Sequence, residues 1–411
     1  MVDIIFCIII VLFVFEFILS TTLDYLNTKN WSTKLPKELK SIYNQKEYTK
    51  SMEYEKDNHI FWKYSSIFMF VIMLVMIVLG FFWDLYDYLW TCTDNTIIQT
   101  LYFFWIIFIF QTIVNLPFSY YQTFTIEEKF WFNKMTKSLF FIDTIKSLAI
   151  SVVIWGWLLT LITWIYLETW NMFWIYTWWV VTILTVFIMM FYTSLIVPIF
   201  NKLTPLKKWL LRNSIEKFAD KVWFTLDNIY VIDGSKRSSK ANAYFSWFWP
   251  KKSIVLYDTL IKDLTTSELV WVLAHEIGHY KRKHTLQMLA FSIIQTGIML
   301  YVLWLAIWMP EISQALWAKE ASFAVWMVAF WILFTPISII FSLIWNVLSR
   351  KNEYQADEFA WINHRPDKLK AALIKLSKNN LSNLQPHPAY EFFYYSHPTV
   401  LKRLWALDKI R

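Results

Sequence analysis

Long apolar runs alternate with polar ones along most of the chain, and this pattern predicts seven membrane-spanning helices. A helix needs roughly 20 apolar residues to cross a bilayer. The stretches that reach this length are residues 2–20, 61–83, 98–120, 147–167, 173–198, 286–309 and 321–345. The first has no basic start and no small-residue cleavage pattern, and it contains Asp3 and Glu16, so we expect a retained span rather than a signal peptide.

The polar stretch between the fifth and sixth spans predicts a folded unit rather than a connector. Residues 228–232, 241–246 and 253–257 are rich in β-branched and aromatic residues and are bounded by turn residues, which predicts a small β-sheet. Thr265 with Glu268 three residues later forms the signature of a capping box, so a helix is expected over 265–284.

These patterns divide the chain into spans and two parts of one extramembrane domain. The predicted parts are 1–198 (five spans with their cytoplasmic loops), 199–285 (first part of the domain), 286–345 (two spans) and 346–411 (second part of the domain).

Composition and charge predict the class of the protein and its orientation in the membrane. Hydrophobic residues make up 57% and charged residues 17% of 411 positions, which indicates a polytopic membrane protein and excludes an ordinary soluble domain. Lysine and arginine gather in the loops 21–60, 121–146 and 199–285, and this positive-inside pattern predicts an amino terminus outside and the domain in the cytoplasm. The net charge of +8 is therefore explained by topology, and nucleic acid is not expected as a partner.

The cysteine content and the most enriched residue types add to this prediction. Cys7 and Cys92 lie in or beside apolar segments, so neither a disulfide framework nor a cysteine metal site is expected. Enrichment in isoleucine, lysine, asparagine and tyrosine indicates an AT-rich bacterial genome and therefore the inner (cell) membrane.

The strongest chemical signal is the segment His-Glu-Ile-Gly-His at residues 275–279. On a helix His275 and His279 lie on one face and can bind one zinc ion, while Glu276 is placed to activate water. The alternative is a helix whose polar residues border a solvated groove. In the helical context predicted for this segment, the motif favours a zinc peptidase.

A catalytic zinc needs a third protein ligand, and residues 352–357 offer one. On a helix Glu353 and Asp357 share a face, so Glu353 can bind zinc while Asp357 orients a zinc-binding histidine through its second ring nitrogen. The alternative is a solvated charged face beside Arg350 and Lys351. Two such coincidences are less probable together than one.

In these motifs the chain resembles the integral-membrane CAAX prenyl endopeptidases, zinc metalloproteases of the gluzincin type. The matching segments, which occur in family order, are 126–130, 201–205, 233–244, 275–279, 349–357 and 395–398.

The resemblance implies a mainly α fold, in which seven transmembrane helices form an α-barrel around a water-filled chamber, capped by a cytoplasmic-side metalloprotease domain. It implies one zinc ion per chain, bound by His275, His279 and Glu353, with Glu276 as the general base and acid.

By the same resemblance, Asn242 binds substrate backbone, while His397 and, as a weaker candidate, Arg403 stabilise the oxyanion. From the residues alone, Asn242 is equally a turn residue at a strand edge, and His397, which precedes a proline, is an ordinary surface turn.

The resemblance also bears on partners. The expected substrates are peptides or proteins, either with prenylated CAAX carboxyl termini or misfolded membrane proteins in quality control, and the protein is expected to be a monomer in the lipid bilayer. The alternatives are a seven-helix transporter or channel with a relay of Asp3, Glu16 and Asp143, and an inactive scaffold with the same fold.

Glycine and tryptophan have exchanged their usual frequencies. The chain holds 5 glycines and 26 tryptophans. Where the family has glycine this chain often has tryptophan, as at Trp62, Trp131, Trp223, Trp247 and Trp249. A membrane-interface belt of tryptophan does not explain those in the polar domain. The hypothesis is that UGA codons meaning glycine were translated as tryptophan.

Overall fold

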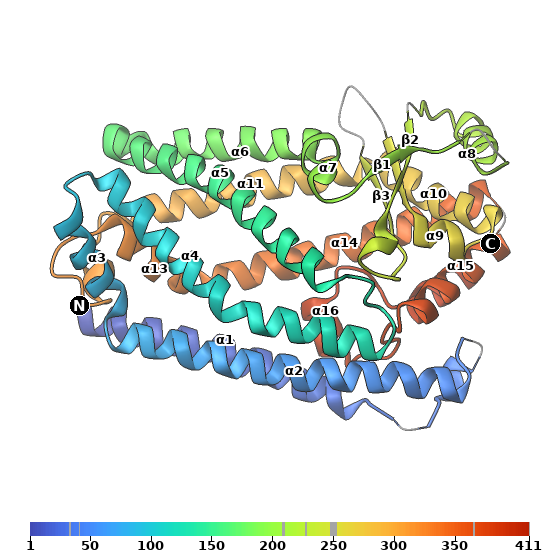
Figure 1. Ribbon diagram of the computed structural model, residues 1–411, viewed down its shortest axis with the longest axis horizontal. Coiled ribbons are helices and arrows are strands. Elements are labelled where there is room, and N and C mark those ends of the chain that lie inside the picture. The colour runs from blue at the N-terminus through green and yellow to red at the C-terminus, as the bar shows by residue number, and fades with distance from the viewer. Residues whose placement is uncertain are drawn as a thin grey trace.

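The computed structural model describes residues 1–411 except 33, 41, 208–209, 227, 247–252, 365 and 411. Figure 1 shows long helices running along the molecule, with the sheet and its surrounding short helices at one end and the amino terminus at the other. The long helices are α1 (Val2–Lys29), α2 (Gln45–Val78), α4 (Thr96–Tyr121), α5 (Lys137–Thr169), α6 (Phe173–Phe191), α11 (His284–Ala306) and α14 (Thr335–Asn363).

Shorter helices connect and cover these elements. They are α3 (Phe81–Cys92), α7 (Val197–Phe200), α8 (Leu210–Lys221), α9 (Asp258–Asp263), α10 (Thr266–Lys281), α12 (Glu311–Gln314), α13 (Phe323–Leu333), α15 (Pro366–Asn379), α16 (Pro388–Tyr394) and α17 (Val400–Asp408). Short 3₁₀ segments are η1 (Lys37–Leu39), η3 (Trp170–Met172) and η5 (Gly234–Lys236), and π-helical segments are η2 (Gln122–Glu127) and η4 (Tyr192–Ile196).

The described residues contain five helical stretches long and apolar enough to cross a membrane, or six if the bent pair α13 and α14 is one span. One of the five, Lys137–Phe200, has 64 residues. Straight, it would be ~96 Å long, three times the ~30 Å of a hydrocarbon core. Figure 1 shows the chain reversing between α5 and α6, far from the sheet. The membrane class is thus confirmed, whereas the count of seven stays a prediction.

Two predicted spans are interrupted. The apolar run 61–83 passes through a helix break at Gly80, whose φ of 74° lies in the left-handed region that glycine adopts without strain. The run 321–345 is bent by 54° between α13 and α14. Pro336, in the first turn of α14, has no N–H to continue the preceding helix, which explains the bend.

The predicted sheet is present, with one strand more than expected. Its strands are β1 (Leu203–Pro205), β2 (Asn228–Ile232), β3 (Ala243–Ser246) and β4 (Ser253–Tyr257), in the order β1-β2-β4-β3. β2 and β4 pair in parallel, and the other two pairs are antiparallel. Strand β1 escaped prediction because it has only three residues and ends in proline. The edge strand β3 begins at Ala243, two residues later than expected.

Candidate active site

The helix that carries His-Glu-Ile-Gly-His starts where the capping box predicts. The Thr265 hydroxyl accepts a hydrogen bond from Glu268 N at 3.4 Å, and the Glu268 carboxylate accepts one from Thr265 N at 2.7 Å. Helix α10 then runs over Thr266–Lys281, ending earlier than the expected 284 because Lys283 adopts a left-handed φ of 59° before α11. The predicted helical context of the motif is therefore confirmed.

Glycine inside the motif lets α10 approach α14 closely. A Cβ atom at Gly278 would lie 3.0 Å from the Ala356 carbonyl oxygen and 3.1 Å from the Ala356 Cα. Real Cβ atoms tolerate such a distance to rigid backbone poorly, so any larger residue would push the two helices apart. The contact brings Glu353, one turn before Ala356, against the two histidines.

The three expected metal ligands meet in one buried cluster. Ligand atoms of His275, His279 and Glu353 all lie within 4.8 Å of one another. The Glu353 carboxylate oxygens lie 3.4 Å from His275 Nε2 and 3.3 Å from His279 Nε2, and the two Nε2 atoms are 3.1 Å apart. Glu353 is only 4% exposed, so this carboxylate is not the solvated charge of the alternative interpretation.

Asp357 and Arg403 surround His275 on the side away from the cluster. Asp357 accepts from His275 Nδ1 at 2.9 Å, so Nε2 is the ring nitrogen that faces Glu353. The Arg403 guanidinium forms two hydrogen bonds with Asp357, at 2.6 and 2.7 Å, and its Nη1 lies 3.4 Å from Glu353. The position predicted for Asp357 is thus found.

Electrostatics make this cluster a site for positive charge. Burial lowers the pKa of His275, but Glu353 and Asp357 outweigh burial and raise this pKa to about 10. Burial raises the pKa of Asp357, yet Arg403 and His275 hold it at about 2. Against burial, His275, His279 and His397 likewise hold the pKa of Glu353 well below its ordinary value. Two buried carboxylates therefore stay ionised beside the imidazoles.

His284 and Gln355 complete the cluster and were not predicted. His284 Nε2 lies 2.9 Å from Gln355 Oε1, and His284 Nδ1 lies 3.0 Å from His279 Nδ1. Because Gln355 Oε1 can only accept, His284 Nε2 carries the proton and donates it to Gln355. His284 Nδ1 then accepts from His279 Nδ1, so that His279 Nε2 keeps its lone pair for a metal. The sequence feature that could have indicated this contact is His284 itself, a third histidine five residues after His279.

A cavity of about 820 Å³ opens onto the cluster. It is lined by all the candidate residues except the buried Asp357: His275, Glu276, His279, Glu353, Asn242, His397 and Arg403. The His397 side chain is 65% exposed, and its Nδ1 lies 3.0 Å from Glu353. Asn242 directly precedes β3, and its side-chain oxygen accepts from Ala243 N at 2.8 Å.

The donor set fits a zinc ion. Two imidazole Nε2 atoms and one carboxylate converge, and each histidine has its Nδ1 engaged elsewhere, by Asp357 and by His284. Two histidines and a glutamate with an open fourth position are typical of catalytic zinc in peptidases.

Comparisons with known proteins show to which family the chain belongs. The family described as CAAX prenyl protease N-terminal, five membrane helices, matches residues 24–202, and Peptidase family M48 matches residues 205–411. CAAX prenyl protease 1 of Saccharomyces cerevisiae is 34% identical over 413 residues, which cover 92% of this chain and 89% of the relative. The CAAX prenyl protease 1 homolog of Arabidopsis thaliana is 35% identical over 386 residues, covering 91% and 90%.

A solved structure has the same fold. Ste24p of S. mikatae superposes with a TM-score of 0.94 at 34% identity, covering 98% of this chain and 99% of that one. The chain therefore belongs to peptidase family M48 and is a membrane-embedded zinc metalloendopeptidase of the CAAX prenyl protease group.

Proposed function

We propose that the protein binds one zinc ion through His275, His279 and Glu353 and hydrolyses peptide bonds in the cavity that opens onto them. The observation that carries the proposal is the convergence of these three ligand groups within 4.8 Å, beside Glu276 in the wall of the same cavity. When bound, zinc supplies Lewis acidity, which activates a water molecule and polarises the scissile carbonyl.

The chain's own residues would perform the remaining steps. Glu276 takes the proton from the attacking water and passes it to the leaving amine, and no covalent intermediate is needed. His397, which is exposed to the cavity, donates to the developing oxyanion. Asn242, at the start of the edge strand β3, binds the substrate backbone.

Asp357 and Arg403 act chiefly as positioning residues in this proposal. Asp357 holds the ring of His275, and Arg403 neutralises Asp357 and lies close to Glu353. Arg403 also lines the cavity, so a direct contact with the oxyanion remains part of the proposal.

The proposed substrates are proteins cleaved near their carboxyl termini. The names of the relatives point to CAAX motifs and prenyl groups, and misfolded membrane proteins are the second candidate class. Incubating the purified enzyme with a prenylated peptide and its unprenylated twin, and mapping the cut by mass spectrometry, separates the two classes. A cut three residues from the end, dependent on the prenyl group, supports CAAX processing.

For the membrane arrangement we propose seven spans in which Lys137–Phe200 crosses twice, around a chamber. The domain parts 199–285 and 346–411 lie in the cytoplasm, the amino terminus lies outside, and the protein is a monomer in the inner (cell) membrane. The basic loops next to the domain support this orientation. Neither the relatives nor the described residues favour the transporter, channel or scaffold alternatives.

Two substitutions test the chemistry. Glu276→Gln should retain zinc by elemental analysis and lower kcat at least ~100-fold, because only the proton acceptor is lost. His279→Ala should lose the metal itself. Full activity in zinc-loaded Glu276→Gln, or unchanged zinc in His279→Ala, would contradict the assigned roles.

A further inference from the structure

The turn after α15, residues 380–383, contributes two amide side chains to the wall of the catalytic cavity. Each has a polar atom without a hydrogen-bond partner among the described residues. Asn380 and Asn383 line this cavity together with His275 and Glu276. Asn380 Oδ1 and Asn383 Nδ2 are buried and have no hydrogen-bond partner within the described part of the chain. Asn383 is 7% exposed. Buried polar groups are nearly always paired, so these two atoms call for a partner from outside the chain, either a ligand or a bound water.

The orientation of Asn383 is fixed by its neighbour. Gln385 N donates to Asn383 Oδ1 at 3.0 Å, so the oxygen end of this amide is already used and its NH₂ end is available. The turn therefore offers one unpaired donor, from Asn383, and one unpaired acceptor, from Asn380. An amide group, with one N–H and one C=O, is the natural complement of such a pair.

Contacts from distant parts of the chain hold the turn in place. The Tyr43 hydroxyl donates to the Ser377 carbonyl and the Ser51 hydroxyl donates to the Leu381 carbonyl, both at 3.1 Å. Tyr43 and Ser51 are 3% and 0% exposed. Leu381 adopts a left-handed φ of 51°, a conformation that a leucine keeps only where its surroundings enforce it. The two amides are thus held before any ligand enters.

A carboxyl group lines the same cavity. Glu55 lies four residues after Ser51 on α2, hence on the same face of the helix, and it lines the same cavity. It forms no hydrogen bond or ion pair with any other described residue, so its oxygens are free to accept. One donor and two acceptors, from the turn after α15 and from α2, therefore line the same cavity.

We propose that Asn380 and Asn383 form a substrate subsite that binds a carboxamide group, either a peptide unit of the substrate main chain or an asparagine or glutamine side chain. The carbonyl of that group accepts from Asn383 Nδ2, and its N–H donates to Asn380 Oδ1. This subsite rests on the proposed peptidase function, because it serves the peptide that is cut at the zinc centre.

The test compares zinc-loaded variants by KM and kcat on a set of peptides that the wild type cleaves. Asn383→Asp keeps the acceptor for Gln385 N but removes the donor, and it should raise KM about fivefold to tenfold with little change in kcat. Asn380→Leu should do the same by removing the acceptor. Asn379→Ser is the matched control, because the exposed Asn379 donates to Asp263 instead, and its KM should equal that of the wild type.

Modified peptides distinguish the two sources of the carboxamide. If a main-chain unit is bound, a peptide with one N–H replaced by an ester oxygen should have a higher KM than the unmodified peptide in the wild type. In Asn380→Leu, which already lacks the acceptor for that N–H, the two peptides should have the same KM. If a side chain is bound, replacing one asparagine or glutamine of the peptide by norvaline should instead raise KM in the wild type and leave it unchanged in Asn380→Leu. Either result supports the subsite.

An unchanged KM in both Asn383→Asp and Asn380→Leu, with normal zinc content and thermal midpoint, would overturn the subsite. The unpaired amide atoms would then be satisfied by bound water. A KM change in the Asn379 control as large as in the variants would also overturn it. If the zinc-loaded wild type cleaves no peptide, the proposed function fails and the subsite with it.

Discussion

At the scale of single residues, tryptophan occupies backbone positions that ordinarily need glycine. Six described residues other than glycine have a positive φ, and four of them are tryptophans: Trp131, Trp170, Trp223 and Trp317. Their φ values are 71°, 21°, 53° and 70°. The left-handed conformation costs a residue with a Cβ about 1–2 kcal/mol.

Three of these tryptophans follow a helix in the same hydrogen-bonded arrangement. Phe132 N donates to Glu127 O, Phe224 N to Ala219 O and Ala318 N to Ser313 O, each across five residues. In such Schellman motifs the residue just before the donor is left-handed and is usually glycine. Here that residue is Trp131, Trp223 or Trp317. The backbone therefore supports the hypothesis that glycine belongs at these positions.

We expect Trp223→Gly to stabilise the purified protein by about 1 kcal/mol, because it relieves the left-handed strain. Trp223 is 90% exposed, so no packing is lost. The matched control is Trp405→Gly, at a 62% exposed tryptophan inside α17, which should destabilise by about 1 kcal/mol because glycine weakens a helix interior. Thermal unfolding in detergent should shift the two midpoints in opposite directions, and a lower midpoint for Trp223→Gly would contradict the argument.

The codons provide an independent test. If glycine belongs at these positions, the gene should carry UGA at residues 131, 223 and 317, and the protein from its source should show glycine there by mass spectrometry. UGG codons would end the hypothesis. Trp247 and Trp249, which also stand where the family has glycine, lie outside the described residues.

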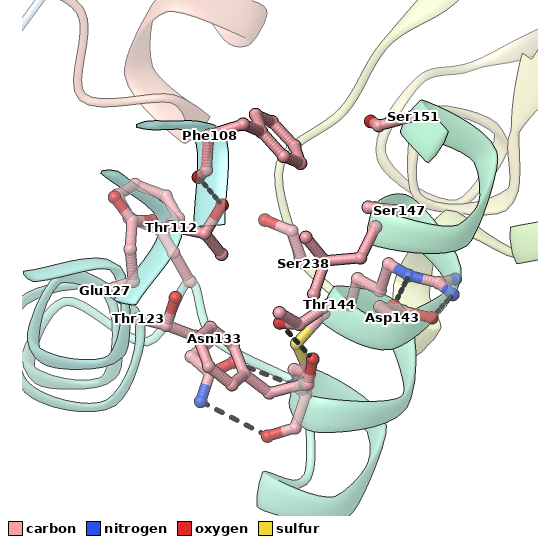
Figure 2. Close-up of a pocket in the computed structure, with 15 residues that line it drawn as sticks. Phe108, Thr112, Thr123, Glu127, Asn133, Asp143, Thr144, Ser147, Ser151 and Ser238 are labelled. Atoms are coloured by element: carbon pink, nitrogen blue, oxygen red, sulfur yellow. Dashed lines mark hydrogen bonds and ion pairs between the residues drawn. The ribbon is translucent and has the colours of Figure 1, made fainter. Parts of the chain in front are cut away.

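At the scale of elements, the loop 233–242 connects the membrane helices to the cavity. Arg237 forms two hydrogen bonds with Asp143 of α5, at 2.7 and 3.0 Å, and a third with the Phe200 carbonyl at 2.7 Å. Figure 2 shows Asp143 on α5, at the side of a pocket of about 490 Å³ between α4 and α5. Lys240 reaches Glu127 at 3.0 Å and the Tyr54 hydroxyl at 2.8 Å.

These contacts fix the start of β3, because Asn242, the last residue of the loop, directly precedes the strand. Arg237→Lys keeps the charge but loses the forked geometry that matches a carboxylate. We expect it to destabilise the protein by about 2 kcal/mol and to lower kcat/KM for peptides. The control is Arg282→Lys, at an exposed pair with Glu358, which should change stability by less than about 0.5 kcal/mol. Equal effects of the two substitutions, measured by thermal unfolding and peptide cleavage, would contradict the role given to the loop.

At the scale of the whole molecule, local patterns account for most of what the sequence predicted. The zinc-binding helix was predictable because its capping box and its motif are both local, and the strands β2 and β4 because they are continuous apolar runs. The interruptions at Gly80 and Pro336 were missed because hydropathy averages over a window and ignores single backbone positions.

Contacts between distant segments could not be predicted from pattern. His284 orients His279 through Gln355, which lies 71 residues away in sequence, and the turn at 380–383 is held by Ser51, more than 300 residues away. Such pairs depend on the packing of α2, α11, α14 and α15 rather than on local spacing. Glu353 and Asp357 were found only because a metal centre demands a third ligand and a partner for histidine.

A native cysteine tests the orientation of the whole molecule in the membrane. Cys92 is exposed at the end of α3, and Figure 1 shows α3 at the end of the molecule opposite to the sheet. If the amino terminus lies outside, a membrane-impermeant maleimide should label Cys92 in intact cells of a Cys7→Ser variant. The matched probe is Asn213→Cys in a chain without Cys7 and Cys92, because Asn213 is exposed on α8 beside the sheet. It should react only after permeabilisation, since loop charge predicts that the domain lies in the cytoplasm. The reverse labelling pattern would invert the topology and put the zinc centre outside the cell.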